Sequence, residues 1–244
     1  IENIESIDDD DAGFAMNLYS PVDQAPGLLK FKLYRSGDPV PLSDILPPLE
    51  NMGLRMLGER PYEIQTAEGA TVWMHDFNLV TREIEEIDLV AVKQKFHDAF
   101  ARVWLGEVEN DGFNRLVLEA GLTWRDVVIL RAYCKYLRQA GVTFSQDYME
   151  RTLAANAGLA GTLVELFLAR FDPSRAGNEN KQAVNELIAE INDGLDAVAS
   201  LDEDRILRHY LSAIEATLRT NYFQTAADGV LKPYLSFKLD SQAL

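Results

Sequence analysis

The residues that could carry out chemistry in this chain are few and far apart. The three histidines, His75, His97 and His209, lie in three different expected elements, and none has a second histidine four residues away, as a helical zinc site requires. No G-x-G-x-x-G follows an expected strand and no G-x-x-x-x-G-K-S/T occurs, so neither a dinucleotide fold nor that type of phosphate loop is predicted. We expect no catalytic, cofactor-binding or metal-binding residue in this chain, and we interpret His97 and His209 as residues on helix faces.

Other candidates for a nucleophile or a metal ligand have simple structural interpretations. Cys134 lies within the helical pattern YCKYL and is expected to be a small core residue without an internal disulfide, in a reducing compartment. No serine occupies a G-x-S-x-G elbow, although a triad assembled in space from distant residues stays open. Asp8 to Asp11 lack the alternating spacing and the glycine of a calcium loop.

One turn has the pattern of a ligand cradle. The stretch Ser36-Gly37-Asp38-Pro39 ends a strand and leads into a helix, so backbone N–H groups at the helix start could receive the carboxylate of an amino acid. The residues that would shape such an effector site are Gly37, Asp38 and Val40. The simpler interpretation is a plain tight turn in which Gly37 supplies backbone freedom.

The elements around this turn form a strand–helix–strand–strand–helix order. Residues 29–34 alternate apolar and basic side chains, which predicts a strand with one solvated face. Residues 42–53 have helical spacing, with a kink or split expected at two central prolines. Residues 55–65 and 70–80 predict a hairpin, and residues 88–105 predict a helix with one apolar stripe. The inward positions proposed for the second hairpin strand are Val72, Met74, Phe77 and Leu79.

The rest of the chain has mainly helical patterns. Helices are expected near residues 113–120, 123–140, 145–156, 158–171, 176–199 and 202–223. Residues 234–240 alternate again and predict a strand without a sequential neighbour. Its partner is expected either in the first sheet or beyond Leu244. The fold class predicted is therefore α+β.

Composition restricts the partners. The 244 residues are 47% hydrophobic and 25% charged, with a net charge of −16, and residues 1–27 are interpreted as an acidic linker. Because nucleic acids and anionic lipids bind through Lys and Arg, neither nucleic acid nor membrane is an expected partner. No apolar run approaches the roughly 20 residues that span a bilayer, and the first residues lack the basic-then-apolar order of a secretory signal, so a cytoplasmic location is expected. A start at Ile1 suggests a piece of a longer polypeptide.

Two resemblances add to this interpretation. The run DPVPLSDILPPLENMGLRML resembles the strand–turn–helix opening of an ACT domain, a regulatory module that often binds amino acids between its copies. The matching positions are Pro39, Leu42, Asp44, Leu46 and Gly53. Val40 stands where that family usually has glycine, which would remove space for a ligand near the backbone.

A longer resemblance covers nearly the whole chain after residue 27. The segments LKFKLYRSGDPVPLSDILPPLENMGLRMLGERPYEI, DGFNRLVLEAGLTWRDVVILRAYCKYLRQAGVTFSQDYMERTLAAN, LRTNYFQ and KPYLSFKLDS resemble the middle part of the large bacterial NAD-dependent glutamate dehydrogenases. That resemblance implies a parent enzyme that uses NAD to oxidise L-glutamate to 2-oxoglutarate and ammonium. It also implies that the catalytic region begins just after the last segment, so that this chain binds no cofactor itself.

The expected organisation follows from these patterns and resemblances together. We expect an acidic linker over residues 1–27, an ACT-like α+β domain over 28–110, a helical domain over 111–233 and a terminal strand over 234–244. The expected function is non-catalytic regulation and assembly, with the sheet pairing side by side with another copy and the helices packing on other segments or subunits of a homo-oligomer. The alternatives are a self-contained module that senses an amino-acid effector, and a complete enzyme of unfamiliar type.

Overall fold

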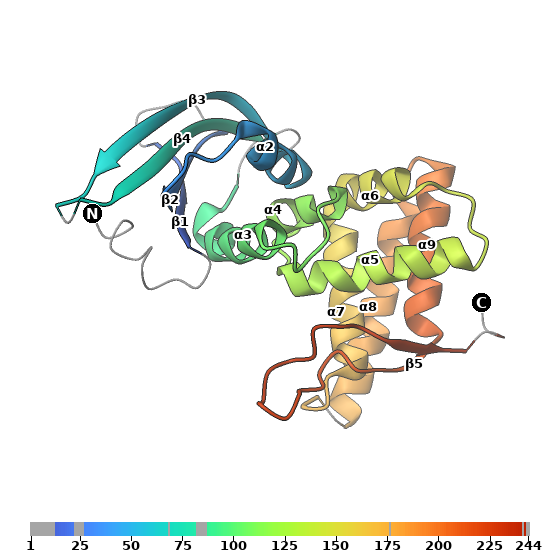
Figure 1. The fold of residues 1–244 in the computed structure, drawn as a ribbon. Helices are drawn as coiled ribbons and strands as arrows, with labels where there is room; N and C mark the ends of the chain where they lie inside the picture. The colour runs from blue at the N-terminus through green and yellow to red at the C-terminus, as the bar shows by residue number, and fades with distance from the viewer. Residues whose placement is uncertain are drawn as a thin grey trace. The chain divides into compact units, whose positions relative to one another are not determined.

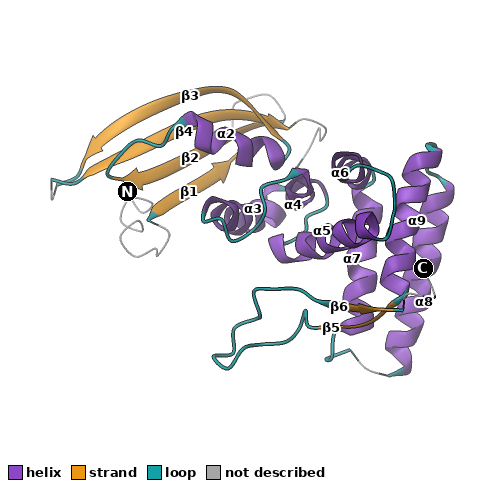
Figure 2. Cartoon of the chain, turned by 45° about the vertical axis from the view of Figure 1, so that its right-hand side comes forward, coloured by secondary structure: helices purple, strands orange, loops and turns teal. Residues whose placement is uncertain are grey.

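The computed structural model describes residues 13–21, 27–67, 69–81, 87–175, 177–240 and 242. Within these ranges the chain forms two compact units, a sheet-containing unit in residues 1–124 and a mainly helical unit in residues 125–244 (Figure 1). Figure 2 colours strands orange and helices purple, so that both kinds of element can be followed in each unit. The predicted α+β class, with a sheet followed by helices and a terminal strand, is confirmed.

The first unit contains an antiparallel sheet with the strand order β1-β2-β4-β3. Its strands are β1 (Phe14–Tyr19), β2 (Leu28–Ser36), β3 (Leu54–Gln65) and β4 (Thr71–Thr81). The predicted hairpin of β3 and β4 is present, and β2 pairs with β4 so that Phe31 lies opposite Phe77. This register stacks the two phenylalanine rings at the centre of the buried face.

Strand β1 corrects the interpretation of residues 1–27 as a linker. Residues 14–19 pair along β2, and Phe14 and Leu18 are buried. Alternating apolar residues therefore give this short stretch a core-facing side despite its acidic surroundings. The acidic residues within residues 1–27 lie outside the described residues; they are Glu2, Glu5, Asp8 to Asp11 and Asp23.

Two helices of the first unit supply the rest of its core. Helix α2 (Leu42–Asn51) runs through Pro47 and Pro48 without the split that these residues predict. The carbonyls of Ser43 and Asp44, which would otherwise accept hydrogen bonds from positions 47 and 48, belong to exposed residues and can be solvated. Of the predicted stripe of Leu89, Val92, Phe96, Phe100 and Val103, helix α3 (Leu89–Trp104) buries all but its first residue, Leu89, which is half-buried.

The first unit extends past residue 110, where the sequence suggests that the sheet domain ends. The short helices η1 (Gly112–Arg115) and α4 (Leu116–Glu119) belong to it. Their apolar side chains Phe113, Leu116 and Val117 are fully buried. Gly53, at a φ of +80°, lies so close to this segment that an added Cβ would be 3.2 Å from Glu119 Oε1.

The second unit contains helices α5 (Trp124–Gln139), α6 (Gln146–Ala155), α7 (Ala157–Phe171), α8 (Asn178–Asp196) and α9 (Leu201–Glu215). Helices α7, α8 and α9 pack side by side, and α5 crosses them (Figure 1). Cys134 is fully buried within α5, with its Sγ 3.3 Å from Met149 Sδ. The prediction of a core cysteine is confirmed.

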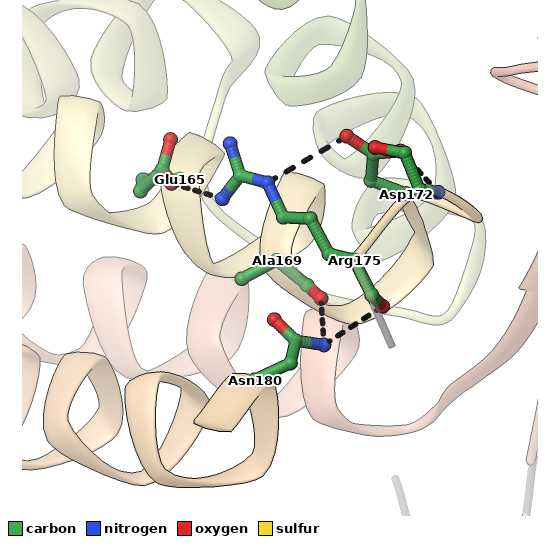
Figure 3. A network of polar contacts seen from close by, with 6 residues as sticks. Glu165, Ala169, Asp172, Arg175 and Asn180 are labelled. Carbon is green, nitrogen blue, oxygen red and sulfur yellow. Dashed lines mark hydrogen bonds and ion pairs between the residues drawn. The ribbon is translucent and has the colours of Figure 1, made fainter. Parts of the chain in front are cut away.

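Polar contacts shape the corner between α7 and α8 (Figure 3). Arg175 forms an ion pair with Glu165 at 2.5 Å and another with Asp172 at 3.6 Å. The side chain of Asn180 donates to the carbonyl oxygens of Ala169 and Arg175 at 2.9 and 3.3 Å. The backbone and hydroxyl of Ser174 hold the pKa of the Asp172 carboxyl below its usual value, with a smaller contribution from Arg175.

A second sheet corrects the prediction for the end of the chain. Helix α9 ends at Glu215, not near residue 223, and β5 (Thr217–Thr220) follows it. The terminal strand is β6 (Phe237–Leu239), and it pairs with β5. Its partner in the structure is therefore β5, which was not among the expected partners. Phe237 stacks on Tyr133 of α5 with 4.5 Å between the ring centroids, which anchors the strand pair to the helices.

Candidate effector site

The turn before α2 places Gly37 and Asp38 at the end of β2. Gly37 has a φ of +90°, and its N–H donates to the carbonyl of Thr71 on the neighbouring strand at 3.0 Å. A positive φ strains residues with a Cβ, so glycine suits the turn irrespective of any ligand. Asp38 is exposed beyond it.

Val40 lies inside the fold and is held by a buried relay of polar groups. Its N–H donates to Nε2 of His75 at 3.2 Å, and Nδ1 of the same ring lies 2.8 Å from Oε1 of Glu59. Since Nε2 accepts, the ring proton is on Nδ1 and is donated to the carboxylate. Val40 and His75 are both buried. The relay therefore ties the turn to β4 and to β3.

This arrangement restricts what the turn can bind. The N–H groups of Gly37 and Val40, which could have cradled a carboxylate, are used within the fold. Helix α2 starts after Pro41, which provides no side-chain cap, and Asp44 lies in its first turn. Asp38 and Asp44 would repel an anion and attract a cation such as an ammonium group.

The same groups do not fit NAD. A dinucleotide pyrophosphate needs free N–H groups at a helix start that follows a parallel strand. The described sheet of the first unit is antiparallel, two N–H groups of its turn are occupied, and Asp44 adds negative charge.

His97 connects α3 to the outer strand of the sheet. Its Nε2 accepts a hydrogen bond from the N–H of Leu18 at 3.0 Å. One turn earlier on α3, Lys93 Nζ donates to the side-chain oxygen of Asn17 at 2.6 Å. Burial lowers the pKa of His97 to about 4, with a smaller contribution from Lys93. Instead of simply projecting from a helix face, His97 fastens β1.

His209 lies on the second unit, far along the chain from the other histidines. It is exposed on α9 and lines a groove of about 450 Å³ together with Arg205, Tyr136 and Phe144. In the described ranges, no three His, Cys, Asp or Glu side chains are grouped so that they could hold a metal ion.

No single helix in the described part of the chain is long and apolar enough to cross a membrane. Helices α6 and α7 reach that length and apolarity only as a pair, bent by 99°.

Comparisons with protein families divide the chain into three parts. Residues 13–92 match the ACT3 domain of glutamate dehydrogenase, residues 108–173 match its helical motif 3, and residues 190–244 match the catalytic domain of bacterial NAD-glutamate dehydrogenase. An NAD-specific glutamate dehydrogenase of Halomonas elongata is 45% identical over 95% of this chain. Those of Pseudomonas aeruginosa and Mycobacterium tuberculosis are 43% and 38% identical over 94% and 89% of it.

This chain belongs to the family of bacterial NAD-specific glutamate dehydrogenases. It spans 14% of the length of each of these three relatives. The ACT3 match of the family begins before β1 and includes it, which agrees with the place of β1 in the sheet. The catalytic-domain match of the family begins inside α8 and includes α9 and both strands of the second sheet. It corrects the expectation that the catalytic region begins just after the KPYLSFKLDS segment, because the match starts at residue 190 and contains that segment.

Three residues that order the ACT3 part were missed as structural determinants by sequence reasoning. No sequence motif marks His75, Glu59 or His97. His75 contacts a backbone N–H in a loop and the side chain of Glu59 on the neighbouring strand, and His97 contacts the backbone of an edge strand. One signal was available for His75. Strict alternation along β4 places it on the same face as Phe77 and Leu79, which are buried. Val72 and Met74 consequently lie on the other face, so the four proposed inward positions do not share one side.

Proposed function

We propose that this chain is a non-catalytic regulatory and assembly segment of a large NAD-dependent glutamate dehydrogenase. The parent enzyme would convert L-glutamate, NAD and water to 2-oxoglutarate, ammonium and NADH. The observation that carries the proposal is the division of the family matches. Residues 13–173 match an ACT3 domain and a helical motif, whereas the catalytic-domain match is confined to residues 190–244. NAD would bind elsewhere in the parent enzyme, because the turn before α2 does not fit it.

The edges of the first sheet affect how such a segment could assemble. At the β1 edge, the N–H of Leu18 is occupied by His97. At the β3 edge, Pro61 removes a donor, and a register shift between Met56 and Gly58 interrupts the ladder. Such features oppose the addition of a further strand. Contacts with other segments and subunits would therefore use helix and loop surfaces more readily than edge-to-edge pairing of sheets.

A charge substitution in the full-length enzyme tests the regulatory role. Asp38→Lys reverses the charge at an exposed turn residue and leaves the buried relay intact, and Glu63→Lys makes the same change on exposed β3. We expect Asp38→Lys to shift the glutamate concentration at half-maximal rate, or its response to added amino acids, while kcat stays unchanged. Glu63→Lys should behave as the parent does. Identical saturation curves for all three proteins would contradict regulation through this turn.

The inactivity of the chain by itself has a separate test. Incubating it with glutamate and NAD should produce no NADH. NADH formation that grows with the concentration of the purified chain would show a complete active site and refute the proposal.

A self-contained amino-acid sensor is the second candidate. The observation that favours it is the pair of exposed carboxylates, Asp38 in the turn and Asp44 in the first turn of α2, which could receive the ammonium group of an amino acid. Calorimetry of the chain with glutamate and aspartate distinguishes the two. Saturable micromolar binding that Asp38→Ala abolishes would support the sensor. The absence of heat would favour the regulatory and assembly segment proposed first.

A further inference from the structure

The second sheet carries a long hairpin arm whose two sides are linked by hydrogen bonds at its base. We use "the arm" for residues 221–236, between β5 and β6. The amide of Asn221 bridges its two sides, because Nδ2 donates to the carbonyl of Tyr234 at 2.9 Å and Oδ1 accepts from the N–H of Ser236 at 2.7 Å. The guanidinium of Arg125 donates to the carbonyls of Tyr222 and Lys232 at 2.5 and 3.4 Å. One arginine therefore fixes both sides of the arm to the start of α5.

Hydrogen bonds between the two sides of the arm continue toward its tip. Lys232 N–H donates to the carbonyl of Gln224 at 3.0 Å, and Ala226 N–H donates to the carbonyl of Val230 at 2.7 Å. Thr225 and Leu231 form an isolated antiparallel bridge. Figures 1 and 2 show the arm as an extended loop that projects beyond the helices next to it. It is a shaped hairpin rather than a loose connection.

The base of the arm has an apolar side that is already covered. Phe237 stacks on Tyr133 and meets Phe167 edge-on at 5.8 Å, and Tyr222 meets Phe167 edge-on at 5.5 Å. Asp126 accepts a hydrogen bond from the hydroxyl of Tyr222 at 3.1 Å. Burial, together with Asp126, raises the pKa of this phenol. These aromatic side chains are therefore already packed against the helices of the second unit.

Other apolar side chains of the arm and its strand remain in solvent. The exposed fractions are 57% for Leu218, 64% for Val230, 42% for Leu231 and 60% for Tyr234. A two-stranded ribbon is only marginally stable in water by itself, and an ordered surface that gathers apolar side chains marks an interaction site. The polar contacts at the base hold this surface in place before any partner arrives.

The occupant follows from the family match. The arm and both of its strands lie within residues 190–244, which match the catalytic domain, and this chain spans only 14% of the length of the NAD-specific glutamate dehydrogenases that it matches. We propose that the arm docks the remainder of the catalytic domain of the same polypeptide, which packs on Val230, Leu231 and Tyr234. The proposal rests on family membership and is independent of the proposed regulatory role.

Site-specific cross-linking in the full-length enzyme tests this proposal. Tyr234 is replaced by the photoreactive residue benzoylphenylalanine, and the matched control carries the same residue at Val90, which is 95% exposed on α3. After illumination, we expect a product of monomer mass on a denaturing gel. Mass spectrometry should place its cross-link in the polypeptide that follows residue 244, in several-fold higher yield than for the Val90 control.

Every other result argues against the proposal. A product of dimer mass would assign the arm to a second copy. A cross-link confined to residues 1–244 would mean that the segment covers its own arm. A yield no higher than that of the Val90 control would mean that nothing docks there.

Discussion

The imidazole of His97 accepts a hydrogen bond from the backbone N–H of Leu18 and so fastens the outermost strand of the sheet to α3. The contact occupies an edge donor that another chain could otherwise use. It also requires an unprotonated Nε2, because a charged imidazole has no acceptor. Folding is therefore linked to the protonation of one side chain.

Stability should depend on pH through His97. Burial lowers its pKa in the folded state from 6.5 to about 4. Above pH 6.5 both states are neutral, and the folded state has its full stability. As the pH falls from 6.5 toward 4, only the unfolded chain takes up the proton, so the free energy of unfolding should fall by up to about 3 kcal/mol. Below the folded-state pKa this contribution should change no further. Urea unfolding across this window measures the effect.

A glutamine at position 97 separates this contribution from that of the carboxylates. In His97→Gln the amide oxygen can still accept from Leu18, but the side chain does not titrate. We expect the variant to lose less stability than the parent between pH 6.5 and 4. Parallel curves would mean that His97 does not contribute to the linkage.

The relay from Val40 through His75 to Glu59 should contribute to the stability of the fold at neutral pH. His75→Ala removes the acceptor of the buried Val40 N–H and leaves a void beside Phe77. We expect a loss of about 2 to 4 kcal/mol in the free energy of unfolding. The control is Glu63→Ala, an exposed residue on the same strand as Glu59, which should change it by less than about 0.5 kcal/mol. Equal effects of the two substitutions would indicate that the relay adds nothing.

Two glycines provide a matched test of close packing in the first unit. Both have a positive φ, +80° for Gly53 and +90° for Gly37, but an added Cβ would meet Arg115 and Glu119 only at Gly53. Substitution by alanine should cost about 1 kcal/mol at Gly37 from backbone strain alone. Gly53→Ala should cost more because η1 and α4 must also move. Thermal unfolding of the two variants gives the comparison, and an equal loss would mean that the segment 112–119 yields freely.

Much of the fold could be predicted because its signals are local. Alternation in β2, the strand-forming residues of β4 and the apolar stripe of α3 are properties of consecutive residues, and the structure contains all three elements. The alternation of Phe14, Met16 and Leu18 was also present, but the acidic composition of its surroundings outweighed it. A composition rule averages over many residues and cannot resolve a six-residue strand.

The end of α9 could not be predicted because its cause is distant in sequence. Leu218 and Tyr222 continue a helical spacing, so periodicity extends the helix. The helix ends before Thr217 in the structure, because Thr217 pairs with Leu239 of β6 and its hydroxyl lies 2.7 Å from the hydroxyl of Tyr133 on α5. The strand that follows pairs with residues 237–239. The position of the turn at Gly37 to Val40 could be predicted. The hydrogen bonds of its N–H groups could not, because their acceptors, Thr71 and His75, are more than thirty residues away in the sequence.

The corner between α7 and α8 offers a prediction about the second unit alone. Asn180→Ala removes two hydrogen bonds to carbonyl oxygens, one on α7 and one in the connection that leads to α8, and should lower the free energy of unfolding by about 1 to 2 kcal/mol. Gln182→Ala, two residues further along α8, removes only an exposed contact with Glu186 and should cost less than about 0.5 kcal/mol. Hydrogen exchange should show faster opening of the first turn of α8 in the Asn180 variant only. If that turn exchanges at the same rate in both variants, the ion pairs of Arg175 hold the corner by themselves.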